Sequence, residues 1–354
     1  MNKRQVTIYA VVAVILAVLV YLQFRTWRDF DWATFWRHTN HVNKFHILHA
    51  VLLIYLGYVM RSLRWKIFLR PVRPQASTLR LIPPTLIGFT GLALLGRPGE
   101  LIRPYLIARK EEQTFSSQLA VWAVERIFDI GAFTGLLVGV IFFATGPKEL
   151  DYYVKFRAGG LVLMALVAGL ALAAWLISKN GEAIADWVES RFSHLASNLG
   201  HRLALRIREF RGGLNTIHGP WELVQLIMVS VLMWYFIALA YQEVTHAYGV
   251  DSLQIQVSQV LLLMGSSMVG SMIQLPGVGG GSQLATISTL KHVFDVPNEL
   301  AASCGIMLWL VTFVAVVPLG LILAHLDRLS FRKLVEETQR EEEASVLPSP
   351  PGSP

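Results

Sequence analysis

The sequence predicts an all-α protein, a polytopic helical membrane bundle of about six full spans plus two re-entrant or broken helical segments. Hydrophobic residues make up 54% of its 354 residues and charged residues only 16%, whereas about 25% of the residues of a soluble domain are charged. The mean hydropathy is +0.49. Several apolar runs reach the roughly 18 to 20 residues that cross a bilayer as a helix, and no stretch alternates as outer-membrane strands do. The bilayer is therefore the main solvent of this chain.

Six apolar runs are predicted as full spans. They are Ile8 to Phe24, His46 to Met60, Phe115 to Thr145, Ala158 to Ile177, Glu222 to Tyr241 and Leu300 to Leu326. The first run follows two basic residues and so resembles a signal peptide, but it is long and lacks an Ala-x-Ala cleavage pattern, which predicts a retained span. The third run exceeds the bilayer thickness, so we expect that helix to tilt or to extend beyond the hydrocarbon.

Two weaker apolar stretches each lead into glycine and proline. Leu81 to Leu95 precedes Gly96-Arg97-Pro98-Gly99-Glu100, and Val257 to Leu275 precedes Pro276-Gly277-Val278-Gly279-Gly280-Gly281. Broken backbone at membrane depth is tolerated only where protein or a polar cavity satisfies its hydrogen bonds. We therefore expect two re-entrant or discontinuous helices, and two simple kinks are the alternative.

The distribution of lysine and arginine tests this topology, because cytoplasmic segments carry the excess of positive charge. With both weak stretches re-entrant and the amino terminus inside, 22 of these residues lie inside and 8 outside; if both stretches crossed, the division would be 15 and 15. The first topology places both termini in the cytoplasm of a cytoplasmic (inner) membrane. It also brings the two breaks in from opposite sides, which is how inverted-repeat transporters build a site near the midplane.

One transmembrane domain is expected over residues 1–326, with a polar connector at 180–219 and a tail at 327–354. The apolar residues of the connector recur every three to five positions beside several arginines. This pattern is typical of an amphipathic helix at the inner membrane surface, or of a solvated helix hairpin beneath the bundle. The tail is charged and then rich in proline and serine, which predicts disorder because it has little to bury.

Three charged residues interrupt the apolar run from 115 to 145. On a helix Glu125 and Asp129 are four apart and share a face, and Arg126 precedes Asp129 by three. Charged residues inside a membrane cost several kcal/mol unless they pair or face a wet cavity. We therefore predict a headgroup or proton-coupling site, with a structural ion pair that locks two helices as the alternative.

The two glycine-rich breaks supply further candidate binding residues. At the first break, Arg97, Glu100 and Arg103 adjoin a predicted helix amino terminus, whose free amides suit a phosphate or carboxylate. Alternatively, the two arginines anchor a cytoplasmic boundary and Glu100 caps the helix. The second break offers backbone amides and one amide side chain, from Gly277, Gly279, Gly280 and Gln283.

Several function classes have no support in the sequence. The net charge of +7 comes from basic residues beside apolar runs, so topology explains it and no nucleic-acid partner is expected. Arg61, Arg64, Lys66 and Arg70, with Trp65, have the pattern of such a cytoplasmic boundary, and contact with anionic lipid is the alternative. Neither a Walker motif nor a metal-protease motif is present, so we expect no cofactor, no metal and no catalytic residue.

Four ordered motifs resemble the lysylphosphatidylglycerol synthase transmembrane, or flippase-like, family. They are Arg61-Ser-Leu-Arg64-Trp65-Lys66, the segment from Gly88 through Gly96-Arg97-Pro98-Gly99-Glu100 to Arg109, Val124-Glu125-Arg126-Ile-Phe-Asp129 and Leu275-Pro276-Gly277-Val278-Gly279-Gly280. The similarity extends over roughly residues 7–325. It implies about eight membrane segments, with Glu100, Arg103, Glu125, Arg126 and Asp129 at matching positions.

The resemblance also implies a lipid-handling role. Members that make a cationic lipid join this bundle to a cytoplasmic aminoacyl-transfer domain, which this sequence lacks, so we do not expect an enzyme. We expect a protein that translocates an anionic phospholipid or a polyprenyl-phosphate-linked lipid between leaflets. The alternative is a non-transporting accessory or scaffold for membrane-bound lipid or glycan synthesis enzymes. Where the family commonly continues toward an Arg-Glu pair, this chain has the neutral residues Ser282-Gln283-Leu284, which leaves the lipid unspecified.

Overall fold

The computed structural model describes residues 30–143, 219–271, 274–275, 279–327, 329 and 334–340, together with parts of 161–211. In chain order its elements are α2 (Trp32–Asn40), α3 (Lys44–Leu69), α4 (Thr78–Leu95), the 3₁₀ turn η1 (Arg97–Leu101), α5 (Ile102–Lys110), α6 (Phe115–Phe143), α8 (Pro220–His246), the 3₁₀ turn η2 (Asp251–Leu253), α9 (Val257–Gly270), β1 (Gln274–Leu275), β2 (Gly279–Gly280), α10 (Gly281–Val293), α11 (Asn298–Trp309), the π-helical turn η3 (Leu310–Val314) and α12 (Val316–Leu326).

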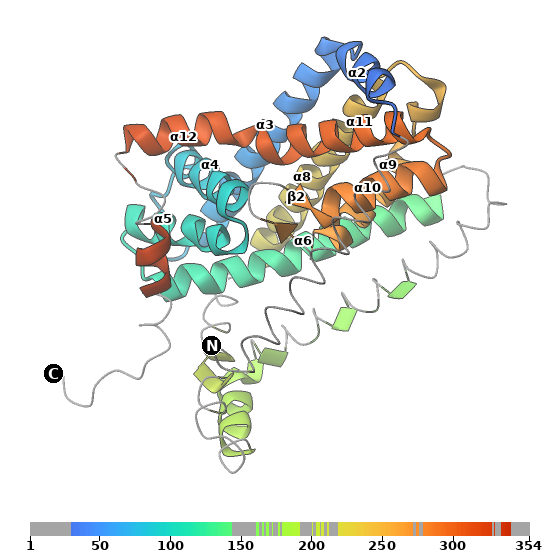
Figure 1. The fold of residues 1–354 in the computed structure, drawn as a ribbon. Coiled ribbons are helices and arrows are strands. Elements are labelled where there is room, and N and C mark those ends of the chain that lie inside the picture. Colours follow the sequence, from blue (N-terminus) through green and yellow to red (C-terminus); the bar gives the residue numbers. More distant parts are fainter. Residues whose placement is uncertain are drawn as a thin grey trace, which may run out of the picture.

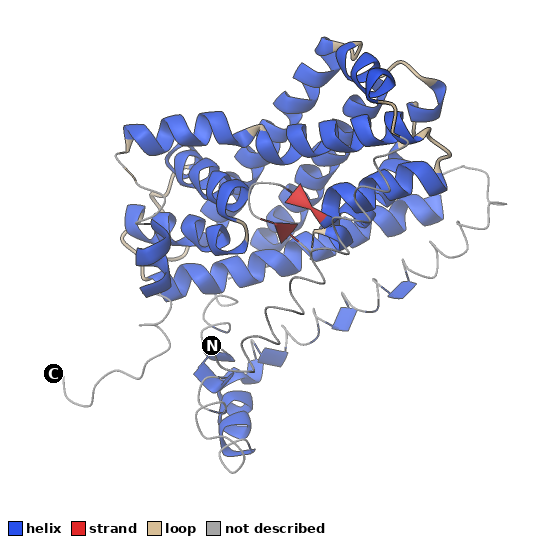
Figure 2. Cartoon of the chain, viewed as in Figure 1, coloured by secondary structure: helices blue, strands red, loops and turns tan. Residues whose placement is uncertain are grey.

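The prediction of an all-α membrane bundle is confirmed. In Figure 2 helices form almost all of the described chain, and the antiparallel β1–β2 pair is the one exception among those residues. Four described runs are long and apolar enough to cross a membrane, namely α3, α4, α8 and the continuous run Asn298–Leu326. The predicted span Ile8 to Phe24, most of Ala158 to Ile177 and the end of the tail lie outside the described residues.

Helix α6 has 29 residues, as many as the continuous run Asn298–Leu326. At 1.5 Å per residue it extends about 43 Å, well beyond the roughly 30 Å of hydrocarbon. Its predicted excess length is therefore present in the structure. Figure 1 shows α6 and the α11–α12 run crossing the whole bundle on opposite sides, with the shorter helices between them.

The antiparallel pair α3 and α8 defines the two ends of the bundle. At one end His46 contacts Glu243, and at the other Arg70 donates a hydrogen bond of 3.2 Å to Gln225. We call these the His46 end and the Arg70 end. Helix α2 packs on α11 at the His46 end, where Thr39 and Ser303 share a hydrogen bond of 2.7 Å.

The first glycine-rich break is the tip of a helical hairpin. Gly96, with φ of 71°, ends α4, and after η1 the chain returns as α5 along the same helix. The two helices approach so closely that a Cβ on Gly88 would lie 2.4 Å from that of Arg103. Glu111, just after α5, lies 3.8 Å from Arg80 in the first turn of α4. The hairpin therefore enters and leaves the bundle at the Arg70 end.

The second break is the tip of an opposed hairpin built from α9 and α10. A Cβ on Gly270, the last residue of α9, would lie 2.2 Å from the carbonyl oxygen of Gly281 at the start of α10. Ile255, just before α9, accepts a hydrogen bond of 3.1 Å from Gln242 of α8 at the His46 end. The two hairpins therefore enter from opposite ends, and Figure 1 shows them facing each other with β2 between.

The element order repeats with reversed direction. A long helix, a hairpin and a second long helix occur as α3, α4–α5 and α6, and again as α8, α9–α10 and α11–α12. The first helices have 26 and 27 residues, and the last runs both have 29. Because α3 and α8 are antiparallel and the hairpins enter from opposite ends, the described chain has the arrangement predicted for an inverted repeat.

The polar connector is described in part. Residues 179–191 are helical, and Arg208 lies 2.7 Å from Asp186 while Arg211 lies 2.7 Å from Glu182. A Cβ on Gly181 would lie 2.6 Å from the Arg211 side chain. Ion pairs thus join residues 182–189 to residues 208–211, and the position of the connector at the membrane surface or beneath the bundle stays a prediction.

Candidate functional site

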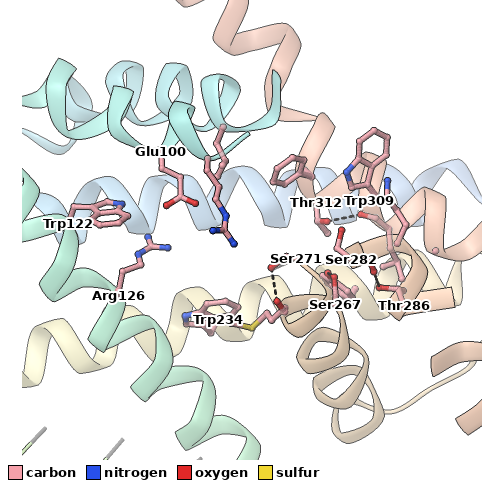
Figure 3. Close-up of a pocket in the computed structure, with 18 of the residues that line it drawn as sticks. Glu100, Trp122, Arg126, Trp234, Ser267, Ser271, Ser282, Thr286, Trp309 and Thr312 are labelled. Atoms are coloured by element: carbon pink, nitrogen blue, oxygen red, sulfur yellow. Dashed lines mark hydrogen bonds between the residues drawn. The ribbon is translucent and has the colours of Figure 1, made fainter. Parts of the chain in front are cut away.

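A cavity of about 700 Å³ lies between the tips of the two hairpins. The first hairpin contributes Leu92, Arg97, Glu100 and Leu101, and α6 contributes Trp122 and Arg126. The second hairpin contributes Ser267, Met268, Ser271, Ser282, Gln283 and Thr286, while α8 and the α11–α12 run contribute Trp234, Tyr241, Gly305, Leu308, Trp309, Thr312 and Phe313. Figure 3 shows Glu100, Trp122 and Arg126 on one side and the labelled serines and threonines on the other.

A compact cluster of charges adjoins this cavity. It consists of two carboxylates, Glu125 and Asp129 on α6, and of four guanidinium groups from three helices, Arg61 and Arg64 on α3, Arg103 on α5 and Arg126 on α6. The sequence predicts that Glu125, Arg126 and Asp129 partly neutralise one another. In the structure most of their partners come from other helices.

Arg64 joins three helices at the centre of the cluster. Its side chain is 0% exposed. It donates hydrogen bonds of 2.8 Å to Asp129 and 3.0 Å to Ser230 of α8, and a third to Glu125. A guanidinium fork that serves two carboxylates at once fixes their separation and orientation. Arg64 therefore holds both acids in place and ties α3 to α6 and α8.

Arg103 attaches the first hairpin to α6. It donates to both oxygens of Glu125, one of them at 3.1 Å, and the pair is buried. Its guanidinium also lies over the ring of Trp65, 4.4 Å from the centroid, and 5.1 Å from that of Phe89. The glycine at position 88 permits this close approach of α5 to α4. The bidentate pair and the stacked rings set the position of the hairpin.

Arg126 is the member of the cluster that faces the cavity. Its side chain is 41% exposed, whereas those of the other three arginines are at most 11% exposed. Its Nη2 lies 3.2 Å from Asp129 and 3.5 Å from Glu125, and the guanidinium packs 5.7 Å from the Trp122 ring centroid. Part of this cation is thus available to a ligand in the cavity.

The cluster holds more positive than negative charge. Its four arginines face two carboxylates, which leaves a surplus of two positive charges, and Arg97 and Glu100 in the cavity lining balance each other. Buried charge is costly unless it is paired. Such a surplus in a site of low dielectric produces a strong positive potential. The chemistry of the site therefore suits an anionic group such as a phosphate.

The structure brings most of the predicted site residues together. Arg97, Glu100, Arg126 and Gln283 line the cavity, Arg103 lines a small adjoining pocket, and Glu125 and Asp129 lie behind Arg126. Gly279 and Gly280 form β2, where the Gly280 amide donates to the side-chain oxygen of Gln283. Gly277 lies outside the described residues.

The favoured interpretation of Arg61 and Arg64 as boundary markers is wrong. Helix α3 continues nine residues beyond the predicted limit at Met60, and both arginines lie in the charge cluster. Arg61 and Arg64, three residues apart, share a face of one helix, as the two acids, four apart, share a face of another. A basic face and an acidic face that can pair were the signal available in the sequence. Lys66 and Arg70 lie outside the cluster. The sequence also gave no indication of the aromatic and hydroxyl lining, which includes Trp234, Ser267, Thr286, Trp309 and Thr312.

Comparison with known proteins is consistent with this fold. The family model described as the lysylphosphatidylglycerol synthase TM region matches residues 8–320. Two proteins of Methanothermobacter thermautotrophicus, each named UPF0104 membrane protein, are 26% and 24% identical over 284 residues, covering 78% of this chain and 82% and 83% of theirs. No solved structure matches the chain. The chain is a multi-pass membrane protein that belongs to the family of the lysylphosphatidylglycerol synthase transmembrane region.

Proposed function

We propose that the protein translocates an anionic lipid, a phospholipid or a polyprenyl-phosphate-linked lipid, between the leaflets of a cytoplasmic membrane. The observation that carries the proposal is the surplus of two positive charges beside a cavity between opposed hairpin tips. A lipid phosphate must leave water to cross the hydrocarbon, and preorganised cations lower that cost by replacing its hydration. The proposal involves no covalent step.

In this proposal Arg126 contacts the phosphate and the other three arginines support it. Arg126 has the exposure and the position for direct contact. Arg64 and Arg103 are committed to Glu125 and Asp129, so they hold the acids that orient Arg126. A charge-assisted hydrogen bond contributes about 1.5 to 3 kcal/mol. The family relation supports a lipid as the bearer of the phosphate.

The opposed hairpins supply the path in this proposal. Each tip reaches the cavity from a different end of the bundle, so a shift of either hairpin opens the cavity to one leaflet while the other remains closed. Without Arg61, Arg64, Arg97 and Arg103, which lie at the cavity, the inside count falls from 22 to 18 against 8 outside. This excess still supports a cytoplasmic location for the Arg70 end and for both termini.

The test is lipid movement in liposomes that contain the purified protein. A fluorescent phosphatidylglycerol in the inner leaflet should reach an added quencher faster than in protein-free liposomes. Arg126→Gln should slow this movement roughly thirty-fold, since about 2 kcal/mol of headgroup binding is lost. The matched control is Arg37→Gln on the exposed surface of α2, which should move lipid at the original rate.

Two results would count against the proposal. One is the same rate with and without protein across phosphatidylglycerol, phosphatidic acid and an undecaprenyl phosphate analogue. The other is equal loss in the Arg126 and Arg37 variants. Absence of transport together with a stable complex with lipid or glycan synthesis enzymes would support the accessory role instead.

A further inference from the structure

The cavity between the hairpins is divided into two chemically different halves. Its charged lining residues, Arg97, Glu100 and Arg126, belong to the first hairpin and α6. Across the cavity, the second hairpin and the α11–α12 run present hydroxyl and aromatic side chains. Figure 3 shows this separation, with Arg126 on one side and Thr286, Trp309 and Thr312 on the other. A ligand that fills the cavity therefore meets a cationic half and a neutral polar half.

Three hydroxyl groups of the neutral half donate their hydrogens within their own helices. Thr286 donates to the carbonyl of Ser282 over 2.7 Å, and Thr312 donates to that of Leu308 over 2.7 Å. Ser271 donates to the carbonyl of Met268 in the same way, over 2.6 Å. Each oxygen keeps lone pairs that can accept from a ligand. This half of the cavity therefore suits a headgroup that brings hydrogen-bond donors.

The hydrogen-bond donors of a lipid headgroup are either ammonium groups or hydroxyl groups. The position of the charged residues in the cavity lining indicates which of the two the neutral half binds. Glu100 is the one carboxylate in the described lining, and it lies in the cationic half with Arg126. A buried ammonium without a carboxylate is strongly disfavoured, whereas a neutral hydroxyl is not. Trp309 and Trp234 add flat apolar faces, which suit the C–H surfaces of a polyol or a sugar ring.

We infer that the substrate is a phosphodiester lipid whose headgroup ends in neutral hydroxyl groups, such as a glycerol, inositol or sugar headgroup. The phosphate lies at Arg126 and the hydroxyl groups donate to Thr286 and Thr312. This inference rests on the proposed lipid translocation and narrows its substrate class. It excludes lipids that carry an ammonium group in the headgroup.

The experiment compares fluorescent lipids with identical acyl chains in liposomes that contain the full chain. Phosphatidylglycerol should move at least about tenfold faster than phosphatidylethanolamine, because one or two hydrogen bonds separate them. The double variant Thr286→Val and Thr312→Val keeps the side-chain shape and removes both acceptors. It should slow phosphatidylglycerol about tenfold and leave phosphatidic acid, which has no polyol, unchanged.

Thr289→Val is the matched control. Thr289 lies on α10 with Thr286 and makes the same bond to its own helix, over 2.9 Å to Ala285, but it does not line the cavity. Its variant should move phosphatidylglycerol at the original rate. Radiolabelled glycerophosphoglycerol, the soluble headgroup, should enter liposomes no faster with the protein than without it. Entry that depends on the protein would mean that the substrate is a soluble phosphodiester and would overturn the lipid assignment.

The remaining outcomes separate this inference from the proposed function. If phosphatidylethanolamine moves as fast as phosphatidylglycerol while Arg126→Gln slows both, the hydroxyl assignment is wrong and lipid translocation stands. Equal slowing of phosphatidylglycerol and phosphatidic acid in the double threonine variant would likewise overturn the assignment, because a structural defect would explain it. If no lipid moves faster than in protein-free liposomes, the proposed function and the inference both fail.

Discussion

Arg64 on α3 donates a hydrogen bond of 2.8 Å to Asp129 on α6, and the two side chains are 0% and 7% exposed. Arg126 pairs with the same carboxylate over 3.2 Å but is 41% exposed. One acid thus joins a fully buried cation to a cation at the cavity surface. The buried cation maintains the structure of the cluster, and the exposed one is available to a ligand.

Replacement of Arg64 with leucine should destabilise the protein. The change removes the fully buried guanidinium that donates to both Glu125 and Asp129, and breaking a buried pair costs about 3 to 5 kcal/mol. Thermal unfolding in detergent should show a clear fall in the midpoint. Arg70→Leu, on the exposed end of the same helix region, should change the midpoint little. Unchanged stability in the Arg64 variant would contradict the structural role.

Close packing of η1 against α4 in the first hairpin predicts that a larger residue at position 99 destabilises the protein and slows transport. A Cβ on Gly99 would lie 2.2 Å from the carbonyl carbon of Gly91, and backbone atoms cannot shift easily. Gly99→Ala should therefore separate η1 from α4, destabilise the protein by more than about 1 kcal/mol and slow lipid movement. Thermal unfolding measures the loss of stability, and the liposome assay measures the rate of lipid movement.

Gly135→Ala is the control for that substitution. Gly135 lies on α6, and a Cβ there would meet no atom within 4 Å. Alanine favours a helix over glycine by about 0.5 to 1 kcal/mol, so this variant should be as stable as the original or slightly more so. Equal losses in the two variants would mean that the hairpin contact has no special importance.

The two hairpins were accessible to sequence reasoning because glycine and proline mark a backbone that cannot continue as a helix. The acids were accessible as well, since Glu125 and Asp129 interrupt an apolar run and need a partner. Arg64 was not, because an arginine after an apolar run has the same local pattern whether it marks a membrane boundary or pairs with an acid 61 and 65 residues away.

The hydroxyl half of the cavity was inaccessible for another physical reason. The hydroxyl groups of Thr286 and Thr312 donate to backbone carbonyls of their own helices. A threonine bonded in this way is tolerated in an apolar helix without a partner from another helix, so its position in the sequence does not mark a site. The convergence of these two residues, which lie in α10 and in η3, depends on tertiary packing. Periodicity within one segment does not encode that packing.

Cysteine labelling can measure the electrostatic potential in the cavity. The chain has one cysteine, Cys304, and it is 0% exposed, so the original protein should resist a water-soluble thiol reagent. Ser271→Cys introduces an exposed thiol at the cavity lining. A positive potential should make an anionic methanethiosulfonate react roughly tenfold faster than a cationic one.

The charge cluster should determine that preference. In the double variant Ser271→Cys with Arg126→Gln, the ratio of anionic to cationic labelling rates should fall, because one cation at the cavity surface is removed. The Arg37→Gln background should keep the original ratio. Equal rates for the two reagents in Ser271→Cys alone would show that the surplus charge of the cluster does not make the potential in the cavity positive.

A hydrogen bond from Tyr55 to the residue after the π-helical turn η3 should affect the position of the cavity residues in that turn. Thr312 and Phe313 line the cavity and both belong to η3, where each turn holds an extra residue and the α-helical hydrogen-bond pattern is interrupted. Tyr55 of α3 donates a hydrogen bond of 2.8 Å to the carbonyl of Ala315, just after that turn. Tyr55→Phe should cost about 1 kcal/mol of stability and slow phosphatidylglycerol more than phosphatidic acid, because a looser turn misplaces the Thr312 acceptor.

Tyr235→Phe, at an exposed position on α8, is the control and should alter neither stability nor the rates of the two lipids. Equal slowing of both lipids in the Tyr55 variant would mean that the bond stabilises the bundle without positioning Thr312.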